Sequence, residues 1–376
     1  MNPTPQLSRP LAHAYEDQQK QFGRAFDLIR AAIARQAFPG AALAVAHGGK
    51  LVASWGFGRF TYEEESPQVQ PNTVFDLASV TKVIATTTMA MMLYERGKLA
   101  LDAAVASVLP GFVSLAPAHQ RGKRESVTIQ MLLAHSSGLP AYEKLFEFTA
   151  NREELVRAAI NTPLTTAPGT RAEYSDIGFI LLGEVLSRKA SESLDEFAQR
   201  EIFQPLGLNE TWFIPPLEMR KEIPPTEHDL TFRKRVIQGE VNDENAWVMG
   251  GVSGHAGMFA SAPDLARFAE FMLRGGEGLV KEPTLRLFTE RQSSPVGTSR
   301  ALGWDTPSHP STSGTRFAPS SFGHLGFTGT SVWIDPKRHL SVTLLTNRTW
   351  PNRSSQLIRE VRPAVHDAIV EAIEGR

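Results

Sequence analysis

Apolar residues recur along this chain with two different periodicities. A period of about 3.6, typical of an amphipathic helix, runs from Gln21 to Gln36 and again from about Ser355 to Ile373. Beside each helical stretch lie two short apolar runs separated by turn residues, which is typical of a β-hairpin. These runs are 41–46 and 51–55, on either side of Gly48-Gly49, and 331–334 and 340–346. The pattern therefore predicts one hairpin and one flanking helix near each end of the chain.

The middle of the chain has a helical pattern instead. Mostly apolar or amphipathic segments end at Pro-Gly or basic-plus-Gly pairs, which commonly stop helices. The predicted helices are 80–94, 127–133, 152–160, 172–188, 194–203 and 263–273. Residues 215–245 are rich in proline and charge, and residues 293–321 are rich in Ser, Thr, Pro and Gly. We expect both to be loops, the first a long loop or lid.

These elements predict an α/β (α+β) fold. The two hairpins can join in one antiparallel sheet flanked by the first and last helices, with a mostly helical second lobe. The expected division is residues 1–72 and 297–376 for the sheet lobe and residues 73–296 for the helical lobe. A site is expected between the lobes, where the chain crosses near Ser79.

Composition narrows the possible functions. The 376 residues carry a net charge of -1, which argues against a broad basic surface for nucleic acid. The chain has no cysteine, which excludes disulfides, thiolate catalysis and zinc–thiolate sites. No apolar run is long enough to span a bilayer. The first twenty residues lack the apolar core of a secretory signal, so we expect a cytoplasmic protein, or a periplasmic one if a signal peptide has been removed.

Ser79 and Lys82 are the first candidate for chemistry. They open the apolar 80–94 helix in the order Ser-x-x-Lys, and helix positions three apart share a face. A base beside a serine hydroxyl can activate it as a nucleophile. Burial lowers the pKa of a lysine, which would let Lys82 act as that base. The alternative is a helix that carries both residues without catalytic purpose.

Two further motifs follow in order. Tyr174-Ser175-Asp176 precedes a predicted buried helix, and His324-Leu325-Gly326 precedes the C-terminal hairpin. Together with Ser79-Val80-Thr81-Lys82, they resemble the three motifs of the serine β-lactamase and penicillin-binding protein superfamily. The resemblance is to the branch with class C β-lactamases, D-Ala-D-Ala carboxypeptidases and family VIII esterases. Flanking sequences such as L-L-A-H-S-S-G-L-P and H-L-G-F-T-G-T-S-V-W-I-D-P agree with it.

The resemblance implies a β-lactamase/transpeptidase-like fold and a serine hydrolase that works through an acyl-enzyme. It implies that Ser79 is the nucleophile, Lys82 its proton acceptor and Tyr174 a second proton-relay group. Backbone N–H groups of Ser79 and Phe327 would form the oxyanion hole. The implied substrate-binding residues are Asp176, His324, Gly326 and Tyr142, although Tyr142 could equally be a surface aromatic residue. No metal or cofactor is implied.

Three positions depart from the β-lactamase pattern. Asp176 replaces the usual Asn, His324 replaces the usual Lys, and Phe327 replaces a small hydroxyl residue. Because a neutral histidine holds a carboxylate less well than lysine does, these changes favour an ester or a D-alanyl peptide amide over an anionic β-lactam. The predicted partner is thus a small-molecule or peptide substrate. Two alternatives remain open: a class C-like β-lactamase, and a penicillin-binding protein that acylates without significant turnover.

Three other residues attract attention without forming a site. His255 lies in the glycine-dense stretch 250–257, where a structural histidine is favoured over one that borders the active site. Asp243 and Glu244 have no histidine at a spacing that would support a metal centre.

Overall fold

The structure is a computed structural model that describes residues 11–375. Its largest sheet has six strands. Its strand order is β1-β3-β2-β11-β10-β9, and all neighbours are antiparallel except β1 and β3. The strands are β1 (Ala12–His13), β2 (Gly40–His47), β3 (Lys50–Gly58), β9 (Phe322–Leu325), β10 (Ser331–Asp335) and β11 (Leu340–Thr346). Both predicted hairpins are confirmed, and the pairing of β2 with β11 joins the two ends of the chain in one sheet.

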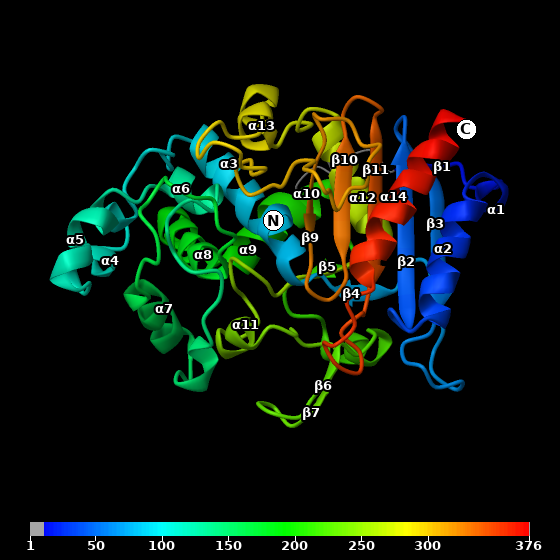
Figure 1. The fold of residues 1–376 in the computed structure, drawn as a ribbon, viewed down its shortest axis with the longest axis horizontal. Coiled ribbons are helices and arrows are strands. Elements are labelled where there is room, and N and C mark those ends of the chain that lie inside the picture. The colour runs from blue at the N-terminus through cyan, green and yellow to red at the C-terminus, as the bar shows by residue number, and fades with distance from the viewer. Residues whose placement is uncertain (1–10, 376) are drawn as a thin grey trace, which may run out of the picture.

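Helices cover both faces of this sheet. Along β2, Leu43 and Val45 pack toward α2 (Gly23–Ala34) and α14 (Ile358–Glu374), the predicted terminal helices. Ala42 and Ala44 point to the opposite face, whose apolar core includes α12 (Ala262–Leu273). This alternation follows from the two-residue period of a strand. Figure 1 shows α2 and α14 lying across the strands.

Apart from α1, which contacts α2 and β3, the remaining helices gather to one side of the sheet, as Figure 1 shows. The predicted mostly helical region is confirmed, although several helices were not predicted, among them α5 and α13. The helices are α1 (Gln18–Gln21), α3 (Thr88–Glu95), α4 (Gly111–Ser114), α5 (Ala118–Glu125), α6 (Ile129–Leu133), α7 (Arg152–Asn161), α8 (Asp176–Ala190), α9 (Leu194–Ala198), α10 (Gln204–Leu206), α11 (Glu244–Val248) and α13 (Glu282–Thr289), with short turns η3 (Val105–Ser107), η4 (Leu145–Glu147) and η5 (Gln199–Phe203). Within residues 11–375 no helix is long and apolar enough to cross a membrane. Residues 1–10, which belong to the predicted sheet lobe and to the segment tested for a signal peptide, lie outside the described residues.

The helix predicted over 80–94 is present, but it is not a uniform α-helix. It begins as a 3₁₀ turn, η1 (Ala78–Val80), widens into a π-helical turn, η2 (Lys82–Thr87), and continues as α3. The Thr88 hydroxyl donates to the Val83 carbonyl five residues earlier, at 3.0 Å, which fits the wide turn. Wide turns of this kind are frequent at functional sites.

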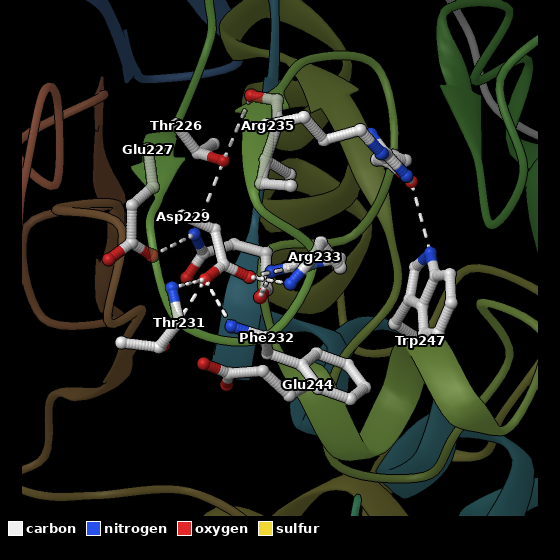
Figure 2. Close-up of polar contacts among 12 residues, drawn as sticks. Thr226, Glu227, Asp229, Thr231, Phe232, Arg233, Arg235, Glu244 and Trp247 are labelled. Atoms are coloured by element: carbon white, nitrogen blue, oxygen red, sulfur yellow. Dashed lines mark hydrogen bonds and ion pairs between the residues drawn. The ribbon is translucent and has the colours of Figure 1, made fainter. Parts of the chain in front are cut away.

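The prediction of a long loop over 215–245 is wrong in part. The segment contains the 3₁₀ turn η6 (Leu217–Glu222), the hairpin β6 (Glu227–Asp229) and β7 (Arg235–Ile237), and the start of α11. Figure 2 shows the reason: Asp229 accepts backbone N–H groups of the turn, from Thr231, Phe232 and Arg233. A second small sheet, β4 (Val74–Asp76), β8 (Phe259–Ser261) and β5 (Thr211–Trp212), was also not predicted. It pairs two- and three-residue segments far apart in sequence, which leave no periodic signal.

Candidate active site

The turn that carries Ser79 is held from below by a buried aspartate. Asp76, the last residue of β4, accepts the backbone N–H of Ala78 at 2.7 Å and that of Asn242 at 2.6 Å. Ala78 has a φ of 45°, in the left-handed region that is costly for a residue with a Cβ. Burial raises the pKa of Asp76 to about 6, against the two hydrogen bonds that lower it. The strained turn presents Ser79 at the start of the central helix.

Lys82 lies directly beneath Ser79 and is fully buried. Its ammonium group donates to Ser79 Oγ at 2.9 Å, to Asp176 Oδ1 at 2.7 Å and to the His255 carbonyl at 2.9 Å. An ammonium group has three N–H donors, so each one has a partner. The three acceptors come from distant parts of the chain and fix the direction of the lysine toward the serine.

The expectation that burial lowers the pKa of Lys82 is wrong for this structure. Burial alone, the largest single effect, would lower the pKa. The Asp176 carboxylate and Tyr174 together outweigh it, so the pKa of Lys82 is raised above its ordinary value. An opposite charge in hydrogen-bond contact favours the charged form. Lys82 is therefore an ammonium in the resting protein at neutral pH.

Tyr174 lies beside Lys82 and is surrounded by ring side chains and cationic side chains. Its ring centroid lies 4.9 Å from Lys82 Nζ and 5.4 Å from Arg300 Cζ. On the other side it packs on the buried His135 ring, with centroids 4.7 Å apart. Burial raises the pKa of the Tyr174 hydroxyl, while Lys82 partly opposes this. The resting tyrosine is thus a neutral phenol whose ionised form the two cations would favour.

The third motif lies on β9 and the turn that follows it. His324 Nδ1 is 2.8 Å from the Leu325 carbonyl, and a carbonyl can only accept. Nδ1 must therefore carry the proton, which leaves a bare lone pair on Nε2, a buried atom without a partner in the described part of the chain. Burial, Lys82 and Arg300 hold the pKa of His324 well below its usual value. The neutral histidine expected from the sequence offers an acceptor where a lysine would offer a donor.

The turn after His324 is hydrogen-bonded to the segment just before Ser79. A Cβ on Gly326 would lie 2.0 Å from Thr330 Oγ1 and 2.3 Å from the Leu77 carbonyl, so only glycine fits. Thr330 and Thr328 donate their hydroxyls to the carbonyls of Leu77 and Asp76. The Phe327 N–H, at the tip, has no hydrogen-bond partner among residues 11–375. It is free to bind a ligand oxygen.

One cavity of about 650 Å³ connects these groups. It is lined by every residue predicted for the site except Lys82, which lies under its floor: Ser79, Tyr142, Tyr174, Asp176, His324, Gly326 and Phe327. Five arginines that were not predicted also line the cavity: Arg300, Arg348, Arg353, Arg359 and Arg362. A signal existed for Arg362, because it lies four residues after Ile358 on the apolar face of the last helix.

His255 has the structural role favoured by the sequence. Its buried ring lies between Ser253 Oγ and Asp243 Oδ1, each at 2.8 Å from a ring nitrogen. Burial alone would raise the pKa of Asp243, but the contact with His255 outweighs burial and lowers that pKa to about 2. These two contacts of the His255 ring hold the loop in place, and the backbone carbonyl of His255 accepts a hydrogen bond from Lys82. No cluster of potential metal ligands is found within the described range.

Comparison with known proteins finds relatives that match most of the chain. The sequence profile of the Beta-lactamase family matches residues 25–365. A protein of Escherichia coli K12, provisionally named a D-alanyl-D-alanine carboxypeptidase, is 33% identical over 312 residues, 76% of this chain and 71% of that protein. A protein of Salmonella typhimurium LT2 with the same provisional name is 32% identical over 330 residues, 79% of this chain and 76% of its own.

Solved structures share the fold. A penicillin-binding protein homologue from Caulobacter crescentus superposes with a TM-score of 0.75 at 20% identity, covering 96% of this chain and 98% of its own. EstCE1, described as a hydrolase with promiscuous acyltransferase activity, superposes with a TM-score of 0.74 at 24% identity, covering 93% and 99%. The structure thus has the β-lactamase/transpeptidase-like fold of the serine hydrolases. The chain belongs to the Beta-lactamase family.

Proposed function

We propose that this serine hydrolase cleaves esters or D-alanyl peptide amides through an acyl-enzyme on Ser79. The observation that carries the proposal is the contact of Lys82 Nζ with Ser79 Oγ at 2.9 Å, at a cavity that is also lined by Phe327, whose N–H has no partner among residues 11–375. A nucleophile, its proton partner and an oxyanion donor are the groups that acyl transfer requires.

The reaction would proceed in two steps. Ser79 Oγ attacks the acyl carbon, and the carbonyl oxygen becomes negative between the N–H groups of Ser79 and Phe327. The bond to the leaving group then breaks, and the alcohol or amine departs with a proton. Water attacks the acyl-enzyme in the second step, which releases the acid and restores the serine hydroxyl.

The proton path has to start from a protonated lysine. We propose that Lys82 loses this proton to solvent, and that the neutral amine then accepts the proton of Ser79, while Asp176, 2.7 Å away, favours the charged form of the lysine. Tyr174 would carry the proton onward to the leaving group. An asparagine at position 176 would not favour the charged lysine in this way, so Asp176 would set the pH at which the proton path operates as well as bind substrate.

The division into two lobes is part of the same proposal. The nucleophile group Ser79, Lys82 and Tyr174 comes from residues 73–296, whereas His324 and Phe327 come from residues 297–376. The cavity is lined by residues of both ranges. A site formed in this way would be assembled by the docking of the sheet lobe on the helical lobe.

The names of the curated relatives support the D-alanyl peptide class, while the ester class rests on the neutral His324 of the third motif. A panel of p-nitrophenyl esters, a D-Ala-D-Ala peptide and a chromogenic cephalosporin separates the candidates. Steady turnover of an ester or the peptide, lost in Ser79→Ala, is the expected result. Preference for the cephalosporin would favour a class C-like β-lactamase, and a stable adduct without turnover would favour an acylated penicillin-binding protein.

A further inference from the structure

The segment L-L-A-H-S-S-G-L-P, residues 132–140, holds the backbone on both sides of Tyr174 through one histidine. The Glu173 N–H donates to the His135 carbonyl at 2.8 Å. The Ser175 N–H donates to Nδ1 of the His135 ring at 3.0 Å. Because Glu173 precedes Tyr174 and Ser175 follows it, His135 fixes the chain immediately before and after the tyrosine.

The ring of His135 also contacts the ring of Tyr174. The two ring centroids lie 4.7 Å apart, with an angle of 34° between the planes, within the range of rings in contact. The His135 ring is also stacked on the Phe179 ring, with centroids 4.9 Å apart. Only 2% of His135 is exposed, so these contacts lie in the protein interior. One buried side chain thus touches both the backbone beside Tyr174 and its phenol ring.

The tautomer of His135 follows from these contacts. A backbone N–H can only donate, so Nδ1 directs its lone pair to Ser175 and the ring proton lies on Nε2. Protonation of Nδ1 would remove this acceptor. Burial, together with the nearby Arg300 and Lys82, holds the pKa of His135 well below its usual value. The ring is therefore a neutral acceptor at neutral pH.

The backbone of His135 has an unusual conformation. Its φ is 55°, in the left-handed region that is costly for a residue with a Cβ. Such a conformation persists only where surrounding contacts fix it, and it is frequent at active sites. In this conformation the carbonyl and the ring nitrogen of a single residue accept from Glu173 and Ser175, which lie two positions apart.

We propose that His135 is a positioning residue for Tyr174, which it holds where the phenol can pass a proton to the leaving group. The proposal rests on the proposed acyl transfer at Ser79 and adds a residue to it. His135 lies outside the lining of the active-site cavity, so it acts through Tyr174 and not on the substrate. Loss of its contacts should therefore affect the departure of the leaving group most.

The test compares two esters with the same acyl group, ethyl butyrate and 4-nitrophenyl butyrate. Both form the same butyryl-enzyme, so they differ only in the steps up to the departure of the alcohol, which kcat/KM reports. Ethoxide needs a proton as it leaves, whereas 4-nitrophenolate leaves readily without one. Titration of the released acid at constant pH measures the first reaction, and absorbance measures the second.

Two variants remove the two kinds of contact separately. His135→Phe keeps a ring and removes the acceptor for the Ser175 N–H. His135→Asn keeps a side-chain acceptor and removes the ring. His366→Phe is the matched control, because His366 is a buried histidine of α14 whose Nδ1 lies 3.2 Å from the Thr312 carbonyl.

The ratio of kcat/KM for ethyl butyrate to that for 4-nitrophenyl butyrate should fall about tenfold in each His135 variant, a part of the effect of losing general acid assistance. A general loss of folded protein would lower both values equally, so His366→Phe should keep the wild-type ratio. In the Tyr174→Phe background, either His135 substitution should leave the ratio unchanged, because the two residues act on one proton transfer.

A wild-type ratio in the His135 variants would overturn the proposal, as would a ratio that falls again when a His135 substitution is added to Tyr174→Phe. Circular dichroism and the thermal midpoint establish which variants fold. If His135→Phe does not fold, His135→Asn and its double variant with Tyr174→Phe decide. The proposed function fails by a different result, which is hydrolysis of both esters by the Ser79→Ala protein.

Discussion

Lys82 and Asp176 form a buried ion pair that joins the central helix to the first residue of α8, with Nζ and Oδ1 2.7 Å apart. The same ammonium group contacts Ser79 Oγ. The charge state of the amine next to the Ser79 hydroxyl is therefore set by a residue 94 positions further along the chain. Asparagine, the residue that the three-motif resemblance implies at this position, would not raise the pKa of the lysine in this way.

The Asp176→Asn variant tests this relationship through pH. Asp176 raises the pKa of Lys82, so its removal lowers that pKa. If Lys82 must become neutral to accept the proton of Ser79, the rise of kcat/KM with pH should move to lower pH in the variant. The measurement is the pH profile for 4-nitrophenyl butyrate. If the rise of kcat/KM occurs at the same pH in Asp176→Asn as in the wild type, Lys82 is not the group that accepts the Ser79 proton. If the variant instead loses activity at high pH, the result would point to Tyr174 as the base.

Ser79→Ala should abolish hydrolysis of every substrate and leave the thermal midpoint close to that of the wild type. One hydroxyl forms the covalent intermediate, and its removal leaves the buried contacts of Lys82 with Asp176 and His255 in place. Intact-protein and peptide mass spectrometry after treatment with a fluorophosphonate should place one adduct on Ser79. An adduct on another serine would show that the nucleophile has been misassigned.

Lys82→Ala and Tyr174→Phe should each lower the acylation rate by about two orders of magnitude, the effect of losing general acid–base assistance. Because the two groups share one proton path, the double variant should be little slower than the slower single one. Stopped-flow acylation rates provide the comparison. Multiplying effects, or a fully active Tyr174→Phe protein with an amide substrate, would leave the tyrosine with a packing role against His135.

A feature of this molecule could be predicted from the sequence only when the residues that form it lie close together in the chain. The hairpins and the terminal helices follow from patterns within a few residues and were found where predicted, and each of the three motifs contributes at least one residue to the same cavity. The raised pKa of Lys82 depends on a carboxylate brought in from α8, which burial alone could not reveal. Three of the cavity arginines are a similar case: Arg348 lies two residues after β11, Arg359 and Arg362 lie on α14, and only the packing of α14 on the sheet brings them to the same cavity.

Asp76 gives a prediction for stability. Its pKa rises from 3.8 to about 6 on folding, so between these values the native state binds more protons than the unfolded state. Its contribution to the free energy of unfolding is therefore fully present below about pH 4 and is lost as the pH rises through about 6. Relative to Asp76→Asn, the wild type should lose on the order of 1–3 kcal/mol between pH 4 and 7. Urea unfolding at both pH values measures this difference, and parallel curves for the two proteins would contradict it.

The last prediction concerns β-lactams. His324 directs its only ring proton to the Leu325 carbonyl and keeps a lone pair on Nε2. A substrate group that meets this atom must be a donor, whereas a β-lactam places its carboxylate near this strand and would meet the lone pair. The wild type should therefore prefer 4-nitrophenyl butyrate to a chromogenic cephalosporin, measured as the ratio of the kcat/KM values. His324→Lys should shift this ratio toward the cephalosporin, since an ammonium group would replace the acceptor. His324→Gln, which can still accept, is the matched control and should leave the preference for the ester unchanged. If the wild type already preferred the cephalosporin, the carboxylate would be held away from His324, and this interpretation of the third motif would be wrong.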